Sequence, residues 1–370
     1  MKKVLIIGGG FAGCTAAHQI SLMNKNYDVT LIEKSNILGA GVRTSYYGGH
    51  PYTFGPRHFL TPHEKVFEFL NKYLPLRKCP EHEAWTYVER DGNFYNFPIH
   101  KDDIEKMPDK ELIYDEIKNA KGVEESKNLE EYWINSVGKT LYEKFVLEYN
   151  KKMWRINDNK IHDTFNWSAK GVALKEGKTR AFWSEWISAY PYNLNGYDDY
   201  FDIATKEANI LLNTSIDHFD IKNKKVFYLG EWHSYDIIIN TISPDYLFEK
   251  CFGELKYSGL DLQLLVLPME KCFPENVYFL YYANKEPFKR LVEYKKFTHY
   301  KSNTTLLGIE VPSANGKYYP MPVKAEKARA KRYLDMFPSD TYSIGRAGSY
   351  EYLVDIDDCI LQAMELCKNL

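Results

Sequence analysis

Three glycines near the N-terminus have the spacing of a dinucleotide-binding turn. Gly8, Gly10 and Gly13 form a GxGxxG pattern directly after the apolar run VLII. Glycines at these positions allow a tight turn, let the backbone approach a pyrophosphate, and permit close packing of strand and helix. Glu33 follows Gly13 by 20 residues, where a carboxylate accepts hydrogen bonds from ribose hydroxyls. The pattern therefore predicts a bound dinucleotide.

A second glycine-rich turn, LGAGVRT at 38–44, favours FAD over NAD as that dinucleotide. It carries Arg43, a cation that could meet the same pyrophosphate. Two later stretches resemble elements of large flavoproteins. YDIIINTISP at 235–244 is similar to their strand-then-proline element, and the run through Gly345 and Arg346 is similar to the segment that closes over the pyrophosphate and the flavin.

The elements that must position these residues can be predicted from hydrophobic periodicity. Residues 3–7 and 27–33 are predicted strands on either side of a helix over 13–23, which together make a βαβ unit. Thr61, Pro62 and Glu64 have the types of a cap, a first helical residue and a capping-box acid. They predict a helix over 62–74.

The rest of the chain alternates between helical and strand composition. Charged, helix-favouring residues at 101–153 predict several amphipathic helices. Residues 209–228 and 235–242 have strand composition, and the apolar and aromatic runs of 263–310 predict an antiparallel sheet. A final helix is expected from about 357 to the end.

We therefore predict an α/β fold built from three parts. A Rossmann-like FAD-binding domain is expected to comprise 1–75, 200–245 and 335–370. An inserted helical subdomain would take 100–155. An antiparallel β-sheet and substrate-binding domain is expected to comprise 76–99, 156–199 and 246–334.

Composition argues against several classes of protein. The 48 basic and 50 acidic residues leave a net charge of −2, which does not favour a nucleic-acid binder. No run approaches the ~18–20 apolar residues of a membrane span, and no secretory signal pattern is present, so a cytoplasmic protein is expected. The six cysteines form no CxxC pair, so neither a metal site nor a disulfide framework is predicted.

Six segments, in their order and spacing, resemble the UDP-galactopyranose mutase family: EKSNILGAGVRT, FGPRHFLT, SVGKTLYEKFVLEYNKKMW, KRLVEYKKF, GKYYP and GRAGSYEYLVD. The resemblance implies interconversion of the pyranose and furanose forms of a nucleotide-diphosphate sugar, UDP-galactose or a similar compound, for surface polysaccharide synthesis. It also implies a homodimer. The FAD would act in its reduced form, by attack of flavin N5 on the anomeric carbon.

The resemblance also implies roles for individual residues. The cofactor would be bound by Gly8, Gly10, Phe11, Ala12, Gly13, Glu33, Lys34, Gly41, Val42, Arg43, Ile216, Gly345, Arg346, Tyr352, Asp355 and Ile356. The substrate would be bound by Phe145, Tyr149, Trp154, Arg180, Tyr190, Arg290, Tyr318, Tyr319 and Tyr352. Catalytic roles would fall to Arg57, His58, Arg180, Arg290, Tyr319 and Tyr352.

Plainer interpretations of these residues stay open. Phe145 and Tyr149 also continue an ordinary core stripe of one helix, and any arginine can form a surface ion pair. Glu310 and Asp355 match family acidic positions but could be solvated loop carboxylates.

The glycine- and lysine-rich stretch 168–180 would suit a loop that closes over the phosphates and carries Arg180 inward.

The chain departs from the family pattern beside the expected flavin. Galactose mutases carry a GAHIFHT-like segment where this chain has GPRHFLT, so Arg57 and Leu60 replace histidines. The second glycine turn also differs, at Ala40 and Val42. These changes leave room for another sugar, such as a deoxy or amino hexose or a heptose. The alternative hypotheses are an FAD-dependent oxidase of the amine-oxidase type and a non-catalytic nucleotide-binding scaffold.

Overall fold

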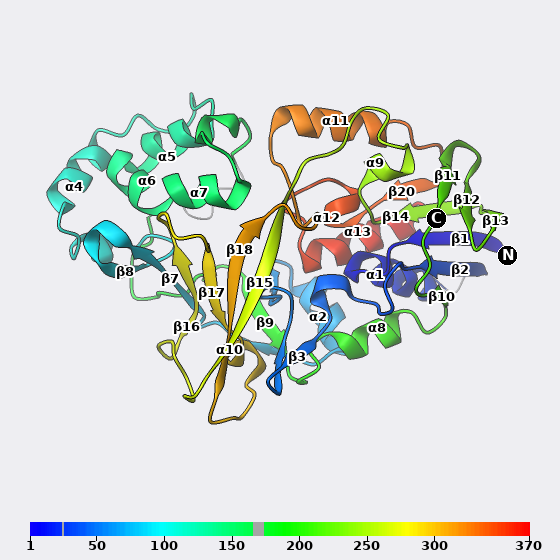
Figure 1. The fold of residues 1–370 in the computed structure, drawn as a ribbon, viewed down its shortest axis with the longest axis horizontal. Coiled ribbons are helices and arrows are strands. Elements are labelled where there is room, and N and C mark those ends of the chain that lie inside the picture. Colours follow the sequence, from blue (N-terminus) through cyan, green and yellow to red (C-terminus); the bar gives the residue numbers. More distant parts are fainter. Residues whose placement is uncertain (24–25, 166–173) are drawn as a thin grey trace.

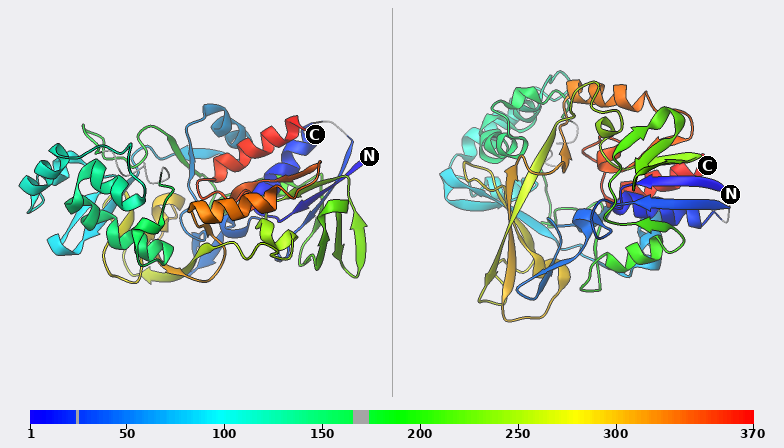
Figure 2. Two further views of the ribbon diagram at one scale, coloured as in Figure 1. Left: turned by 90° about the horizontal axis from the view of Figure 1, so that it is seen from above. Right: turned by 45° about the vertical axis from the view of Figure 1, so that its right-hand side comes forward.

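The computed structural model describes residues 1–23, 26–165 and 174–370. The molecule is elongated, with a nucleotide-binding lobe at one end and a group of helices at the other (Figure 1). A second, strongly twisted sheet lies between them, as the view from above also shows (Figure 2). Both chain ends lie in the nucleotide-binding lobe.

The nucleotide-binding lobe is built on a five-stranded parallel sheet. Its order is β10-β2-β1-β14-β20. Val4 at its centre pairs with Val29 on one side and Ile237 on the other, so strands from distant parts of the chain are neighbours. Burial on both faces explains the apolar runs of these strands. The strands are β1 (Lys2–Ile7), β2 (Tyr27–Ile32), β10 (Asn209–Leu211), β14 (Ile237–Asn240) and β20 (Thr341–Ser343).

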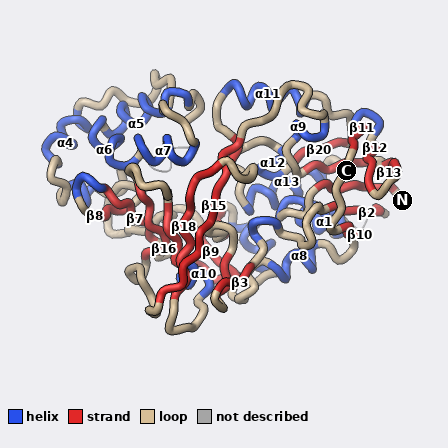
Figure 3. The backbone as a smooth tube through the Cα atoms, in the orientation of Figure 1, coloured by secondary structure: helices blue, strands red, loops and turns tan. Residues whose placement is uncertain are grey.

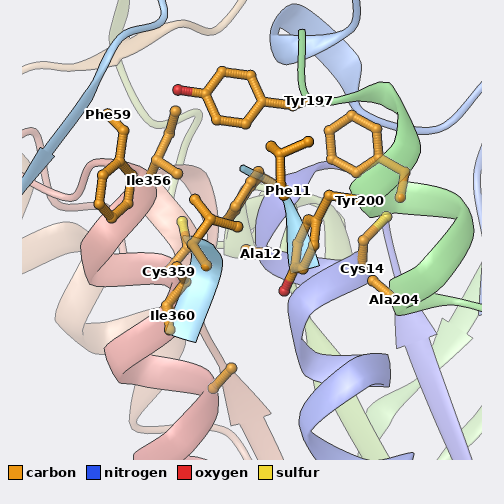
Figure 4. Packing of buried hydrophobic residues seen from close by; sticks show 14 of the residues in the cluster. Phe11, Ala12, Cys14, Phe59, Tyr197, Tyr200, Ala204, Ile356, Cys359 and Ile360 are labelled. Carbon is orange, nitrogen blue, oxygen red and sulfur yellow. The ribbon is translucent and has the colours of Figure 1, made fainter. Parts of the chain in front are cut away.

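Helix α1 (Phe11–Ser21) forms the core of this lobe with α8 (Asp198–Ala204) and the C-terminal α13 (Ile356–Lys368). Figure 4 shows Phe11 beside Tyr200, with Ile356 and Cys359 of α13 facing it. The rings of Phe11 and Tyr200 are stacked, with centroids 5.4 Å apart. The first and last helices of the chain therefore share one core.

The helix predicted over 62–74 begins two residues later than expected, as α2 (Glu64–Tyr73). Thr61 ends strand β5 (Phe59–Thr61), and its hydroxyl accepts a hydrogen bond from the backbone N–H of His63 at 3.1 Å. The prediction that Thr61 caps this helix was wrong, because its hydroxyl closes a short turn ahead of the helix instead.

The middle sheet has the order β19-β15-β18-β17-β16-β7-β8. The expectation of an antiparallel sheet was wrong at one place, because β7 and β16 are parallel. Strands β15 and β18 pair from Gly259 to Leu267. The strands are β7 (Glu83–Val88), β8 (Asn93–Asn96), β15 (Tyr257–Leu267), β16 (Val277–Tyr282), β17 (Arg290–Glu293), β18 (Thr305–Ser313) and β19 (Tyr319–Pro320).

The helices at the far end enclose a separate apolar core, in which Trp133, Leu141 and Phe145 are buried. They are α3 (Lys101–Ile104), α4 (Lys110–Lys118), α5 (Leu129–Val137), α6 (Lys139–Phe145) and α7 (Leu147–Trp154). Figure 3 shows that helices dominate this end, whereas strands fill the middle. None of the helices among the described residues is both long and apolar enough to cross a bilayer.

Smaller elements complete the fold. They are strands β3 (Ser45–Tyr47), β4 (His50–Tyr52), β6 (Leu76–Lys78), β9 (Ile187–Pro191), β11 (His218–Asp220), β12 (Lys225–Tyr228) and β13 (Glu231–Ser234), and helices α9 (Pro244–Leu247), α10 (Tyr294–Thr298), α11 (Lys324–Leu334) and α12 (Gly345–Gly348). The predicted fold class, a Rossmann-like unit with inserted helices and a second sheet, is confirmed. The domain boundaries remain a prediction.

Candidate active site

The first glycine turn is packed so tightly that Gly13 has no room for a side chain. A Cβ on Gly13 would lie 2.0 Å from the carbonyl oxygen of Gly8, so any larger residue would clash with backbone. Gly8 itself has a φ of 99°, which glycine adopts readily. Helix α1 has Gly10 as its N-cap, without a side-chain hydrogen bond to the first turn. The first N–H groups of α1 are therefore available to an anion.

Glu33 joins the first glycine turn to the loop after β2. Its carboxylate accepts hydrogen bonds from the backbone N–H of Gly9 and of Ser35, both at 2.8 Å. The second glycine turn is also held to the first, because Gly39 donates its N–H to the carbonyl of Gly9 at 2.8 Å. The two turns predicted to hold a dinucleotide thus lie together, as a cofactor with a pyrophosphate and an adenosine requires.

Five other residues that were predicted to bind the cofactor lie in three parts of the structure. Arg43 follows the second turn and lies 3.3 Å from Asp198, whereas Lys34 is exposed. Ile216 packs on the outer face of the parallel sheet, just after Thr214, whose N–H donates to the carbonyl of Glu33. Arg346 lies on α12 and Asp355 is the N-cap residue of α13. Arg346 Nη2 is 3.3 Å from Asp355 Oδ1.

A cavity lies where three parts of the molecule meet. These are the segment from α12 to the start of α13, the middle sheet, and helices α6 and α7. Its lining includes many of the residues predicted as catalytic, substrate-binding or cofactor-binding: Arg57, His58, Phe145, Tyr149, Arg290, Tyr319, Arg346, Tyr352 and Asp355. These side chains come from segments up to about 300 residues apart in sequence, so the fold brings them together.

Arg290 is oriented by a buried carboxylate. Glu310, on the neighbouring strand, is fully buried and receives hydrogen bonds from Arg290 Nε at 3.1 Å and Nη2 at 2.8 Å. Lys289 Nζ lies 3.3 Å from the same carboxylate. Burial raises the pKa of Glu310, but the opposing effect of Arg290 and Lys289 is larger, so the pKa ends below its usual value. The carboxylate is therefore charged, and it fixes two cations at the cavity wall.

The cavity carries an excess of positive charge. Four cations line it, Arg57, Lys289, Arg290 and Arg346, against the carboxylate of Asp355. The carboxylate of Glu310 lies behind two of these cations, which leaves an excess of two positive charges. An anion such as a diphosphate suits this environment.

Tyr319 and Tyr352 form part of the wall near these cations. Their ring centroids are 6.0 Å apart. Burial raises the pKa of Tyr319, but the nearby charges of Lys289, Arg57 and Arg290 prevail, so this pKa lies below its usual value. Burial raises the pKa of Tyr352 instead. Because the pKa of Tyr352 lies above its usual value near 10, this hydroxyl is protonated at pH 7.

The far end of the cavity is aromatic. Phe145 and Tyr149 face it from α6 and α7, and Tyr149 meets Tyr281 of the middle sheet edge to face at 5.7 Å between ring centroids. The guanidinium of Arg290 lies 5.0 Å from the ring centroid of Phe279 and 5.7 Å from that of Tyr281. Flat rings beside cations suit a nucleobase joined to phosphates.

His58 also lines the cavity, but it is packed into an aromatic box. Its ring stacks on Phe297 with centroids 5.5 Å apart, and it meets the buried His82 edge to face at 5.1 Å. Burial holds the pKa of His82 well below its usual value, so this second ring is neutral at pH 7. From the sequence, His58 was named as a candidate but His82 was not.

Four of the residues predicted to bind substrate or to act in catalysis are not among those that line the cavity. Arg180 pairs with Asp102 at 2.7 Å on the outside. Tyr190 is buried against Phe297, and Tyr318 stacks on Phe54. Trp154 lies one layer back, with its ring centroid 5.1 Å from that of Tyr352. The proposed closing loop of 168–180 falls partly on residues 166–173, which lie outside the described residues. The roles given to these residues stay predictions.

Sequence reasoning missed Lys289, Tyr281 and Phe279, which line the cavity from the hairpin of β16 and β17. A signal existed for Lys289, because it directly precedes Arg290 in KRLVEYKKF. No group of three or more potential metal ligands occurs among the residues that the structure describes.

Two family models match the chain. The model described as UDP-galactopyranose mutase covers residues 144–352, and that of an NAD(P)-binding Rossmann-like domain covers residues 6–73. A protein named "Probable UDP-galactopyranose mutase" from Klebsiella pneumoniae is 24% identical, over 98% of this chain and 93% of its own. A "dTDP-fucopyranose mutase" from Escherichia coli is 25% identical, over 100% of this chain and 98% of its own.

Solved structures agree in fold. A structure of reduced UDP-galactopyranose mutase superposes with a TM-score of 0.81 at 18% identity, covering 99% of this chain and 93% of that one. A putrescine oxidase variant superposes less well, with a TM-score of 0.61 at 12% identity, and covers 99% and 98%. These two results concern the fold, whereas the family model matches more than half of the sequence. The chain therefore belongs to the UDP-galactopyranose mutase family of isomerases.

Proposed function

We propose that this protein interconverts the pyranose and furanose forms of a nucleoside-diphosphate sugar, with reduced FAD as its cofactor. One observation carries the proposal: a single cavity runs from an aromatic end, past cations held by a buried carboxylate, to the nucleotide-binding lobe. These three surroundings match, in order, a base, a diphosphate and a sugar that faces a cofactor.

The residues present fit FAD. Its pyrophosphate would lie on the uncapped start of α1, and its ribose would meet Glu33, while Arg57, Arg346 and Asp355 would surround the flavin end. When bound and reduced, FAD supplies an electron-rich N5 for the anomeric carbon of the sugar.

The chain itself would bind and orient the nucleotide sugar. Phe145 and Tyr149 would hold the base, and Arg290 with Lys289 would hold the diphosphate as its charge grows during cleavage of the anomeric bond. Because Glu310 already orients Arg290, little reorganisation is needed in that step. Tyr319 and Tyr352 would contact the sugar and keep it between the cations and the cofactor.

The cationic cavity argues against the rival oxidase hypothesis. An amine oxidase binds a substrate that is a cation at neutral pH, and four lining cations would repel it. The putrescine oxidase likeness is one of fold, on which many activities occur.

The test uses purified enzyme reduced with dithionite and a panel of UDP-, dTDP- and GDP-sugars, beginning with UDP-galactose and dTDP-fucose. Chromatography that separates the two ring forms should show conversion of one nucleotide sugar by the reduced enzyme and none by the oxidised enzyme. Conversion that is independent of reduction, or oxygen consumption with an amine, would contradict the proposal.

We further propose a cytoplasmic enzyme that supplies furanose donors for a surface polysaccharide. Five cysteines are free thiols, which suits a reducing compartment: Cys14, Cys79, Cys251, Cys272 and Cys359. The family resemblance leads us to expect a homodimer, which size-exclusion chromatography with light scattering would measure.

A further inference from the structure

A half-buried lysine outside the cavity holds the loop between two strands of the cavity wall. Lys152 lies on α7, and its side chain is 12% exposed. Its Nζ is close to the backbone carbonyl oxygens of four loop residues: Tyr282 at 2.9 Å, Asn284 at 3.1 Å, Glu286 at 2.9 Å and Phe288 at 2.9 Å. Every second carbonyl of this loop therefore points at one ammonium group.

The arrangement resembles the coordination of a metal ion more than ordinary hydrogen bonding. An ammonium group has three N–H donors, yet four carbonyl oxygens surround this one. Rings of backbone carbonyls replace the hydration shell of monovalent cations elsewhere in proteins. The carboxylate of Glu286 adds a negative charge 3.7 Å away.

The loop depends on this cation for part of its hydrogen bonding. Among the described residues, no backbone N–H donates to the carbonyls of Asn284, Glu286 or Phe288. Carbonyl groups that face inward without a donor are costly, so the loop needs a positive group at this point to keep its shape.

The loop joins two strands that carry one wall of the cavity, and α7 carries the adjoining wall. Tyr281 and Arg290 lie just before and just after the loop, while Tyr149 lies on α7 one turn from Lys152. The rings of Tyr149 and Tyr281 meet edge to face at the aromatic end of the cavity, with centroids 5.7 Å apart. The contact made by Lys152 therefore ties these walls together from behind.

We propose that Lys152 is a positioning residue whose ammonium serves as a tethered monovalent cation, fixing the loop 282–288 to α7 and with it the spacing of the two cavity walls. The effect on ligand binding rests on the proposed function, since it assumes that a nucleoside diphosphate lies against these walls. The carbonyl cage itself does not depend on that assumption.

The cage makes a chemical rescue possible. Truncation of Lys152 to alanine would leave four oxygens around an empty position, of a size that suits NH₄⁺ or K⁺ better than Na⁺. A surface hollow lined by Glu148, Lys151, Asn284 and Glu286 borders Lys152, so a small cation can enter from solvent. Lys151 is a matched control, because it is the adjacent lysine on α7 and, within the described part of the chain, its side chain pairs only with Glu148, at 3.3 Å.

The experiment compares wild type, Lys152→Ala and Lys151→Ala as FAD-loaded enzymes in NaCl and in NH₄Cl of equal ionic strength. In NaCl, we expect Lys152→Ala to lose about 3–6 °C in melting temperature and roughly tenfold in affinity for UDP or dTDP. Ammonium should restore at least half of both losses. Wild type and Lys151→Ala should respond equally to the two salts. Lys152→Met should resist rescue, because its side chain blocks the cage.

Two results would overturn the proposal: wild-type nucleotide affinity in Lys152→Ala, or the same ammonium response in all three proteins. If Lys152→Ala does not fold, Lys152→Gln is measured instead, and wild-type affinity in that variant would overturn it equally. A wild-type enzyme that binds neither nucleotide would contradict the proposed function, whereas the ammonium-dependent melting of Lys152→Ala would still report on the cage.

Discussion

Glu310 holds two cations at once, which makes it the residue on which the charge of the cavity wall depends. It has no exposed surface and meets both Arg290 and Lys289. Removing one member of a buried ion pair leaves the others without compensation, at a cost of about 3–5 kcal/mol. The arginine would also lose the fork geometry that prepares it for a phosphate.

Glu310→Gln should therefore weaken nucleotide binding by at least tenfold while FAD stays bound, as measured by calorimetry and by flavin absorbance. Glu326→Gln is the matched control, since Glu326 is also buried and bonds to Arg329 at 2.7 Å on α11, away from the cavity. It should lower stability but leave affinity unchanged. Equal affinity losses in both variants would mean that the effect is one of folding.

Asp357, in the first turn of α13, should make stability depend on pH. It is 4% exposed, and burial, together with Asp358 and Asp355, raises its pKa to about 7. The folded state therefore favours the protonated carboxyl. Its contribution to stability is complete below about pH 4, the pKa of an unfolded aspartate, and is lost as pH rises towards 7.

Asp357→Asn should thus stabilise the fold by about 2–4 kcal/mol at pH 8, which raises the melting temperature, and should change stability little at pH 4. Calorimetric scans at the two pH values measure the difference. Asp335→Asn, which alters a surface pair with Lys331, should give the same small change at both. A uniform gain for Asp357→Asn would contradict the assigned cause.

At the scale of elements, two glycines of the turn before α1 should have different roles. Gly13 is needed for folding, whereas Gly10 is needed for ligand binding. A Cβ at Gly13 would meet backbone at 2.0 Å, whereas one at Gly10 would meet only the side chain of Ala40, at 3.7 Å. Gly13→Ala should therefore disrupt the turn and prevent recovery of folded, flavin-loaded protein. Gly10→Ala should keep its melting temperature within about 2 °C but lose flavin, because its methyl group would occupy the approach to the pyrophosphate. Flavin absorbance per protein chain measures both, and full flavin content in Gly13→Ala would contradict the account.

The local elements were predictable because short-range signals define them. The glycine turn, Glu33 and the βαβ unit follow from residues within about 30 positions of one another. The start of α2 was misplaced because Thr61 could either cap a helix or end a strand. Pairing with β9 (Ile187–Pro191) holds Thr61 in the extended conformation of strand β5. A pairing partner more than 100 residues away leaves no local trace.

Only those residues of the site that lie within a family motif were predictable from the sequence. Arg290 and Tyr319 were found through the family resemblance, whereas Tyr281 and Phe279 have the alternation of any partly buried strand. The motif around Arg180 suggested a phosphate contact, and that role stays a prediction, while its guanidinium pairs with Asp102. Which partner an arginine meets depends on elements brought together by the fold.

At the scale of the whole molecule, charge is distributed unevenly. The chain has a net charge of −2, yet its cavity carries an excess of two positive charges. Nucleotide binding should therefore weaken as ionic strength rises, since salt screens the attraction between charges. Calorimetry at 20 and 300 mM NaCl should show at least a threefold rise in Kd for UDP or dTDP. A nucleoside without phosphates is the control and should show none. A Kd independent of salt would mean that the cations are neutralised in the free enzyme.

The order of strands in the parallel sheet has a consequence for biosynthesis. β1 is made first, but its neighbour β14 and the edge strand β20 are separated from it by more than 200 residues, and α13, which packs on α1, comes last. While the ribosome is still translating, the first half of the sheet has one uncovered edge and α1 lacks its partner. The nascent chain can therefore close this core only after β14, β20 and α13 have been made, and until then it presents an apolar surface that chaperones recognise.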